Sequence, residues 1–229
     1  MLVGMLKQAT KKFKQTLAEI GLKLIHKPRK PSLTKIKGKK FYLHPKVFNP
    51  KWTFSSIFLA ENLEVNNGDV VLDLGCGNGF QTVFIAQKAS YVLALDLNPA
   101  AVKCTKINVK LNGLKNKVDV LAGNLFQPLK NEKFNLIVFN PPYLPGNPKN
   151  ILEKAWLDRE GLLIKKFFDE AKKYLKPKGK IQIVYSDIAV LNPNEIEKLI
   201  EDNNFKIIRK VKKKFMFETL TVYSAIKNS

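Results

Sequence analysis

The sequence predicts an α/β protein built on an open, doubly wound and mostly parallel β-sheet. Three observations support this class. From Trp52 onward, short apolar runs of strand length alternate with longer segments of helical periodicity. A glycine-rich turn at residues 75–79 follows the first of these runs and leads into a helix, as a βα unit requires. The length of 229 residues and the hydrophobic fraction of 45% suit one such domain with a small extension.

The first fifty residues are predicted to form a basic extension. Pro28 and Pro31 end its first helix, and residues 35–43 predict a hairpin that turns at Gly38. The helix could pack on its own domain with its lysines toward solvent, lie on a membrane, or bind a partner. We expect an extension at residues 1–50 and a main domain at residues 51–229. The helix is predicted from apolar side chains that recur every three or four residues, namely Leu2, Leu6, Ala9, Phe13, Leu17, Ile20 and Leu24.

The elements of the main domain follow in order. Pro99 suits the first turn of one helix and Asn112-Gly113 its end, while Pro177 and Gly179 end another. Strands that alternate with helices predict parallel βαβ units, whose ligand binds at the carboxyl ends of the strands. Seven strands are expected, at residues 69–74, 91–95, 118–121, 134–139, 181–185, 205–211 and 215–226. Four helices are expected, at residues 80–88, 99–111, 162–175 and 195–202.

The charge of the chain is strongly positive and unevenly distributed. The sequence has 40 Lys and Arg residues against 19 Asp and Glu, a formal net charge of +21. Residues 1–51 hold 14 of the basic side chains and one acid, and residues 206–214 form a second acid-free basic run. Solubility requires a net charge of only about 2–8, so the excess indicates a polyanionic partner such as RNA. Only three of the basic residues are Arg, which favours diffuse attraction to phosphates over base readout.

The composition excludes several classes of protein. Two cysteines and two histidines exclude a disulfide scaffold and a zinc site built from these residues, so we expect no metal. No apolar run reaches the roughly 18 residues of a membrane span, and the N-terminus lacks the apolar region of a signal peptide. We therefore expect a cytoplasmic protein without a membrane partner.

A glycine loop follows the first strand of the main domain. Asp73 lies near the end of this strand, and Gly75, Gly77 and Gly79 follow in the spacing G-x-G-x-G. Glycines there let the backbone turn sharply and approach a ligand closely. The dinucleotide-binding fingerprint G-x-G-x-x-G requires a third glycine at residue 80, where this chain has Phe80. This difference argues against a nicotinamide oxidoreductase. The stretch closely resembles the glycine loop of the class I S-adenosylmethionine-dependent methyltransferases. This resemblance implies a Rossmann-like sheet of seven strands with an antiparallel last strand, and S-adenosyl-L-methionine as cofactor.

Two further residues complete the predicted cofactor site. Asp96 ends the next strand, where a carboxylate can accept both hydrogen bonds of a ribose diol. Its alternative role is to cap the helix that begins near Asn98. The resemblance implies an acidic residue after the third strand to bind the adenine amino group. Asn124 stands there instead, and its side-chain oxygen can accept the same bond without charge.

The sequence Asn140-Pro141-Pro142-Tyr143 follows the fourth strand directly. Two consecutive prolines exclude helix and remove two backbone donors, so the turn is rigid and presents carbonyl groups. The Asn140 side-chain oxygen and the Pro141 carbonyl could each accept one N–H of an amide or exocyclic amine and turn the nitrogen lone pair toward a methyl donor. Tyr143 could stack on a flat acceptor.

This tetrapeptide resembles the motif of the amino-methyltransferases, which modify adenine N6, guanine N2 or the amide of glutamine. Residues 47–50 and Glu153-Lys154-Ala155-Trp156 resemble the HemK-like and small-methyltransferase groups. The chain departs from the HemK-like pattern at Lys51-Trp52-Thr53, which replaces an acidic pair, and in the reduced glycine content of residues 157–161.

We expect an N-methyltransferase that acts on an exocyclic amino group of RNA, guanine N2 or adenine N6 of rRNA or tRNA. The alternatives are a protein glutamine N5-methyltransferase that acts on a translation factor and a non-catalytic RNA-binding assembly factor. The expected partners are therefore nucleic acid, with RNA favoured, or the ribosome or a translation factor. The sequence leaves open whether a small partner subunit binds.

Overall fold

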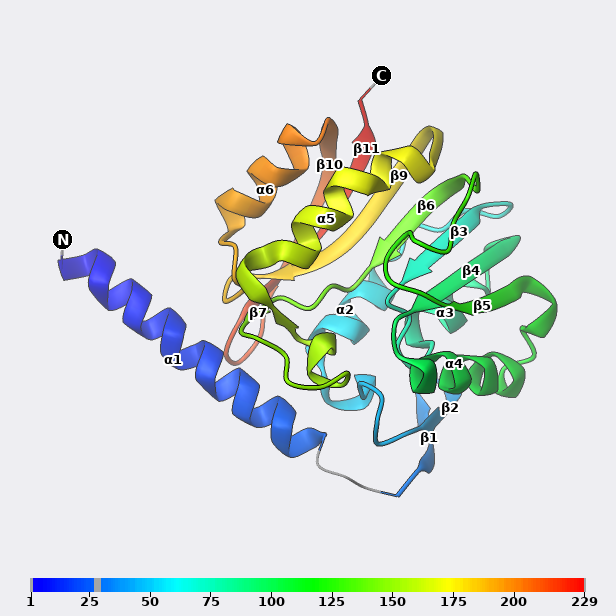
Figure 1. Cartoon of the computed structure of the whole chain (residues 1–229), viewed down its shortest axis with the longest axis horizontal. Coiled ribbons are helices and arrows are strands. Elements are labelled where there is room, and N and C mark those ends of the chain that lie inside the picture. Colours follow the sequence, from blue (N-terminus) through cyan, green and yellow to red (C-terminus); the bar gives the residue numbers. More distant parts are fainter. Residues whose placement is uncertain (1, 27–29, 229) are drawn as a thin grey trace.

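The computed structural model describes residues 2–26 and 30–228. Its centre is one seven-stranded β-sheet with helices on both faces (Figure 1). Across the sheet the strands follow the order β10 (Phe205–Lys214), β11 (Thr219–Lys227), β9 (Leu175–Ser186), β6 (Phe134–Phe139), β3 (Val70–Leu74), β4 (Tyr91–Asp96) and β5 (Val118–Ala122). The five strands from β9 to β5 are parallel, whereas the last strand, β11, is antiparallel to both neighbours. The predicted α/β class and the doubly wound, mostly parallel sheet are confirmed.

The two faces of the sheet carry separate hydrophobic cores. Alternate residues of a strand point to opposite faces, so Leu72 and Leu74 of β3 enter one core and Val71 enters the other. The helices α5 (Leu162–Ala171) and α6 (Pro193–Asp202) cover the first core. The second core lies beneath α2 (Phe54–Glu61), α3 (Phe80–Ile85) and α4 (Pro99–Leu111). This layering leaves the carboxyl ends of the parallel strands open at one edge.

Helix boundaries follow the capping residues closely. The Asn98 side chain accepts a hydrogen bond from the Ala100 N–H at 2.9 Å, and Pro99 occupies the first turn of α4, which therefore has its predicted bounds. At α6, Asn192 and Glu195 form a capping box behind Pro193. The start of α4 agrees with the prediction, whereas α6 begins two residues before its predicted start at residue 195.

The segment after α5 differs from the prediction. The helix expected over residues 162–175 ends at Ala171, and after a short turn of 3-10 helix the chain enters β9 at Leu175. Pro177 and Gly179 lie inside this strand. The proline is tolerated because the register with β6 jumps between Leu175 and Lys180, so the ladder does not need its missing N–H. The helix α2 and the two-residue strands β7 (Leu144–Pro145) and β8 (Leu157–Asp158) were not predicted.

The hairpin of the extension packs on the main domain. Strands β1 (Ser32–Ile36) and β2 (Lys39–Leu43) are antiparallel, and the turn at Lys37-Gly38 has both φ angles positive, as the sequence predicts for Gly38. The Asn108 side chain of α4 bonds both backbone groups of Tyr42, accepting from its N–H at 2.6 Å and donating to its carbonyl at 3.0 Å.

The N-terminal helix, α1 (Leu2–Ile25), contacts the domain near its C-terminal end, and its N-terminal half projects beyond it (Figure 1). Ala18 and Leu22 pack on a cluster that includes Trp156, and the Gln15 amide donates to the Ile188 carbonyl at 2.7 Å. The helix itself was predicted, while its predicted end at Pro28 lies outside the described residues. Within residues 2–26 and 30–228, the structure contains no helix long and apolar enough to cross a membrane.

Candidate active site

A cavity of about 690 Å³ opens at the carboxyl ends of β3, β4, β5 and β6. Segments far apart in the sequence form its walls, including the glycine loop, α1, the start of α2 and the turn before β11. Predicted site residues that line it are Gly75, Gly77, Asp96, Asn124, Asn140, Pro141, Pro142 and Tyr143. Asp73 and Gly79 lie outside this lining. The topology therefore brings eight of the ten predicted site residues to one cavity.

The glycine loop has the open backbone that a nucleoside cofactor needs. Gly77 has a φ of 58°, and a Cβ built on it meets no atom within 4 Å, so a side chain there would enter the free space of the cavity. Gly79 has no room for a side chain, because its φ is 79° and a Cβ would lie 2.9 Å from the Thr105 side chain. Gly77 thus keeps the cavity floor open, and Gly79 lets α3 pack against α4.

Asp96 joins the glycine loop to the start of α4. One carboxylate oxygen accepts from the Gly77 N–H at 2.8 Å and the other from the Asn98 N–H at 2.8 Å. Burial raises the pKa of this carboxyl, and the two backbone donors oppose the rise. Each oxygen keeps a further lone pair, so the group can also accept hydroxyl groups of a ribose.

Asp73 supports the loop from beneath. Its side chain is buried and accepts a hydrogen bond from the Thr82 hydroxyl on α3. Burial raises the pKa of Asp73 to about 7, and the bond from Thr82 opposes this rise. Its position ties the end of β3 to α3 without reaching the cavity.

The third strand contributes Asn124 through the turn after β5. The Gly123 N–H donates to the Asp96 carbonyl at 2.9 Å, which holds this turn against the end of β4. Asn124 is half-buried and lines the cavity. Its side chain is therefore available to a group bound beside Asp96.

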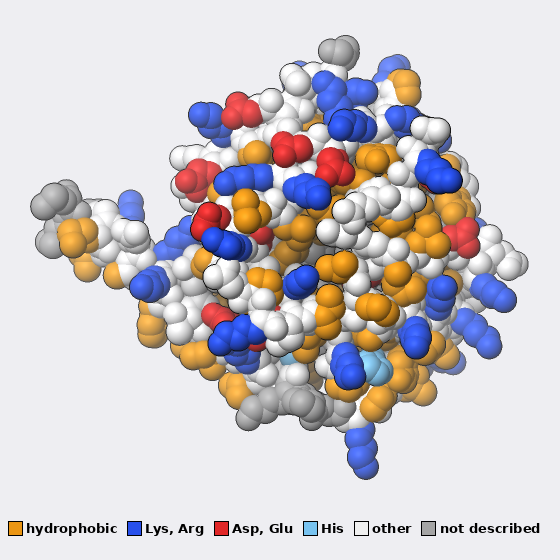
Figure 2. Space-filling model, viewed as in Figure 1, with side chains coloured by type: hydrophobic (Ala, Val, Ile, Leu, Met, Phe, Trp, Pro, Cys, Tyr) orange, Lys and Arg blue, Asp and Glu red, His pale blue; other side chains and the backbone are white. Residues whose placement is uncertain are grey.

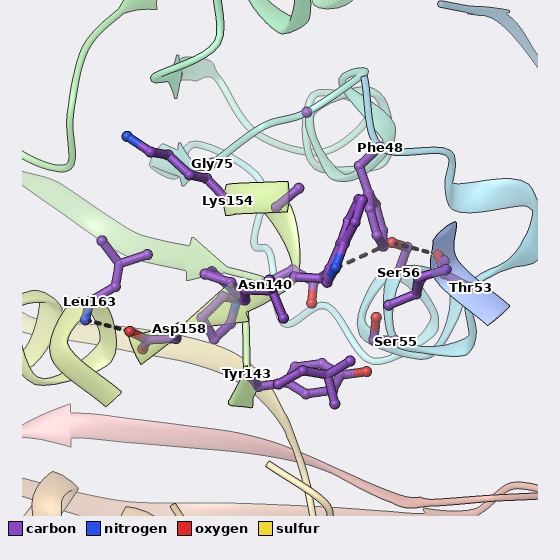
Figure 3. Close-up of a pocket in the computed structure, with 18 of the residues that line it drawn as sticks. Phe48, Thr53, Ser55, Ser56, Gly75, Asn140, Tyr143, Lys154, Asp158 and Leu163 are labelled. Carbon is purple, nitrogen blue, oxygen red and sulfur yellow. Dashed lines mark hydrogen bonds between the residues drawn. The ribbon is translucent and has the colours of Figure 1, made fainter. Parts of the chain in front are cut away.

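The Asn140 side-chain amide is oriented by residues of α2 (Figure 3). Its Nδ2 donates to the Ser56 hydroxyl at 3.2 Å, which leaves Oδ1 as an acceptor. The Ser56 and Thr53 hydroxyls are 3.3 Å apart, and Thr53 also reaches the Pro50 carbonyl at 3.3 Å. The Ser56 hydroxyl is thus shared between the Asn140 amide and the Thr53 hydroxyl, which connects the Asn140 side chain to the residues before and within the first turn of α2.

Tyr143 is held by both its backbone and its hydroxyl. Its carbonyl accepts from the Val190 N–H at 2.8 Å, and its hydroxyl donates to the Glu218 carboxylate at 3.2 Å. Glu218 also accepts from the Ser186 hydroxyl at 2.6 Å. Burial raises the pKa values of both Tyr143 and Glu218, so the phenol stays protonated and acts as the donor.

Several lining residues have no signal in the sequence. Ser56 is 84 residues from its partner Asn140, and Glu218 is 75 residues from Tyr143. The Asp158 carboxylate, which lies in the cavity wall, caps α5 by accepting from Leu163 N–H at 2.9 Å (Figure 3). Chemically, the cavity combines a glycine loop and a carboxylate that can accept further hydrogen bonds with an amide oxygen and an aromatic ring.

The chain matches known methyltransferases in sequence. The methyltransferase small domain family matches residues 39–219. A protein of Methanocaldococcus jannaschii, assigned by its name to the protein N5-glutamine methyltransferases, is 33% identical over 202 residues, covering 84% of this chain and 98% of the relative. The release factor glutamine methyltransferase of Aquifex aeolicus is 31% identical over 169 residues, 67% of this chain and 59% of that enzyme. The human methyltransferase HEMK2 is 29% identical over 182 residues, 74% of this chain and 83% of the relative.

Solved structures show the same fold at lower identity. The 16S rRNA N2 G1207 methyltransferase of Thermus thermophilus, solved with S-adenosylmethionine and guanosine, has a TM-score of 0.64 and 24% identity, over 88% of this chain and 52% of that one. The tRNA m1G37 methyltransferase of M. jannaschii also has a TM-score of 0.64, with 22% identity over 89% of this chain and 58% of that one. At these identities the likeness concerns the fold.

Proposed function

The chain belongs to the methyltransferase small domain family, and from this premise we propose that it methylates the side-chain amide nitrogen of a glutamine in a translation factor. It is an S-adenosylmethionine-dependent N-methyltransferase. The observation that supports the choice of acceptor is the match, over 98% of the relative's length, to the M. jannaschii protein that is assigned by name alone to the N5-glutamine methyltransferases. The Aquifex relative is named for release factors, which supports such a factor as the acceptor protein.

The cofactor fits the glycine-loop end of the cavity. The open space above Gly77 admits a nucleoside, Asp96 would bind the ribose hydroxyls, and Asn124 would accept from the adenine amino group. When bound, S-adenosylmethionine supplies an electrophilic methyl group. Gly75 and Gly77 would bring the backbone close to it, and Asp73 would act through the loop that it supports.

The acceptor residues act by position. An amide nitrogen is planar and weakly nucleophilic, so its N–H groups must be held while its lone pair faces the methyl carbon. We assign these contacts to Asn140 Oδ1 and the Pro141 carbonyl, with the rigid Pro142 fixing the turn and Tyr143 lying against the flat amide. The nitrogen would gain the methyl group as the sulfonium C–S bond breaks, with S-adenosylhomocysteine as the leaving group, and would release one proton to water. This arrangement stabilises the transition state by fixed dipoles, without a side-chain base.

RNA is the second candidate acceptor, and the net charge of +21 favours it. A positive net charge also suits an acidic protein or a factor bound to the ribosome. It therefore discriminates between the two acceptors less well than the match to the M. jannaschii relative does. RNA, which the charge and the departures from the HemK-like pattern favoured as the acceptor, therefore becomes the second candidate.

The test incubates the protein with methyl-labelled cofactor and either a purified release factor of the same organism or its total RNA. We expect label on a glutamine of the factor, released by protease and retained after nuclease. Label in RNA alone would show that the acceptor assignment is wrong. Asn140→Ala should lower kcat by about 10²–10³-fold with cofactor affinity retained. Asn194→Ala, at an exposed position on α6, is the matched control and should leave both unchanged.

A further inference from the structure

The N-terminal helix contacts the domain with the face opposite to its apolar stripe. At 100° per residue, Ala18 and Leu22, which pack on the domain, lie on the other side of the helix from Phe13 and Ile20. If α1 served only to pack on its own domain, it would bury its most apolar face against that domain. The domain instead contacts the opposite face and leaves most of the stripe exposed, and among the described side chains of the stripe only Leu17 borders the cavity.

The exposed stripe is long and regular. Its side chains are between 36% and 64% exposed, and Figure 2 shows hydrophobic side chains along the outer edge of the projecting helix. Such a run of spacings of three, four and seven residues is the pattern by which one helix docks in a groove or against another helix. The stripe consists of Leu6, Phe13, Leu17, Ile20 and Leu24.

The stripe reaches the mouth of the reaction cavity. Leu17 belongs to it and also lines the cavity, as does Gly21 one turn further on. A macromolecule that inserts a side chain into the cavity must cover this mouth. The same macromolecule would then meet the stripe, which continues from the mouth toward the projecting end of α1.

The charges beside the stripe define the chemistry of its partner. By helical angle, Lys12 and Lys23 lie on one side and Lys7 and Lys14 on the other. The single acid of the helix, Glu19, is paired with Lys23 at 2.6 Å. Two copies of α1 packed stripe to stripe would bring like charges together, which disfavours a second copy of this chain. An acidic partner with an apolar face fits both features.

We propose that the stripe of α1 docks an acidic segment of the acceptor protein that presents an apolar face, and so delivers the glutamine to the cavity. This inference rests on the proposed protein acceptor. The phosphates of an RNA would pair with the lysines and leave most of the apolar stripe exposed. The stripe together with the neighbouring cavity mouth favours a protein.

The test compares the double variant Phe13→Gln/Ile20→Gln with the control Gln8→Ala, an exposed position of the same helix off the stripe. Both are assayed as full chains on the whole release factor and on a peptide of about ten residues around its acceptor glutamine. We expect the double variant to raise KM for the whole factor at least tenfold with kcat retained. Its kinetics on the peptide, and all values for Gln8→Ala, should match the unmodified protein.

Four other results would overturn the proposal. An unchanged KM for the whole factor would show that the stripe does not dock it. An equal loss on factor and peptide would mean that α1 only shapes the cavity. If the unmodified protein co-sediments with phosphatidylcholine–phosphatidylglycerol vesicles, the double variant does not, and KM for the factor is unchanged, then the stripe binds a membrane. If the unmodified protein methylates neither factor nor peptide, the proposed acceptor itself fails, and this docking with it.

Discussion

Replacing Asp73 with Asn should remove a large pH dependence from the stability of this protein. Asp73 is buried at the end of β3 with the Thr82 hydroxyl as donor, and burial raises its pKa from 3.8 to about 7. One pKa unit corresponds to about 1.4 kcal/mol, so ionising this carboxyl in the folded protein costs about 4 kcal/mol more than in the unfolded chain.

The sign of the effect follows from the raised pKa. Below pH 3.8 the carboxyl is protonated in both states, and Asp73 contributes no penalty. Between 3.8 and about 7 the unfolded chain loses the proton while the folded protein keeps it, so stability falls as the pH rises. Above pH 7 the penalty is constant. About 3 of the 4 kcal/mol of this loss of stability therefore arise between pH 5 and pH 8.

The assay is urea unfolding of the unmodified protein and Asp73→Asn at pH 5 and pH 8. The stability of the variant relative to the unmodified protein should rise by about 3 kcal/mol between these two pH values. Asp169→Asn, at an exposed position on α5, serves as control and should change this difference by less than about 0.5 kcal/mol. A difference for Asp73→Asn that is independent of pH would refute the reasoning.

Three further predictions concern single contacts. Gly123→Ala should destabilise the protein by at least about 2 kcal/mol in urea unfolding, since its Cβ would lie 1.9 Å from the Pro128 ring; unchanged stability would contradict the geometry. Tyr143→Phe keeps the ring but removes the bond to Glu218, so kcat should fall about tenfold with cofactor affinity unchanged; an unaltered kcat would show that this bond does not orient the ring. Cofactor at a thousand times its Kd should raise the free energy of unfolding by about 4 kcal/mol, and Gly77→Val, which places a side chain in the cavity, should abolish the increase; a retained increase would place the cofactor elsewhere.

Much of the fold was predictable because its signals are local. The β3–α3 unit, the bounds of α4 and the turn at Gly38 depend on caps, glycines and alternation within a few residues. The start of β9 was missed for the opposite reason. Pro177 ordinarily ends an element, and only the register jump against β6 lets a strand continue through it.

The sequence by itself determined the two chemical motifs of this protein, the loop of Gly75 to Gly79 and the tetrapeptide that begins at Asn140. Both depend on backbone conformations that neighbouring residues impose. Only the tertiary structure decided that Ser56 would orient the Asn140 amide, that Glu218 would hold Tyr143, and that α1 would turn its stripe away from the domain. A hydrophobic period fixes which residues share a helix face, but which body covers that face depends on contacts between residues far apart in the chain.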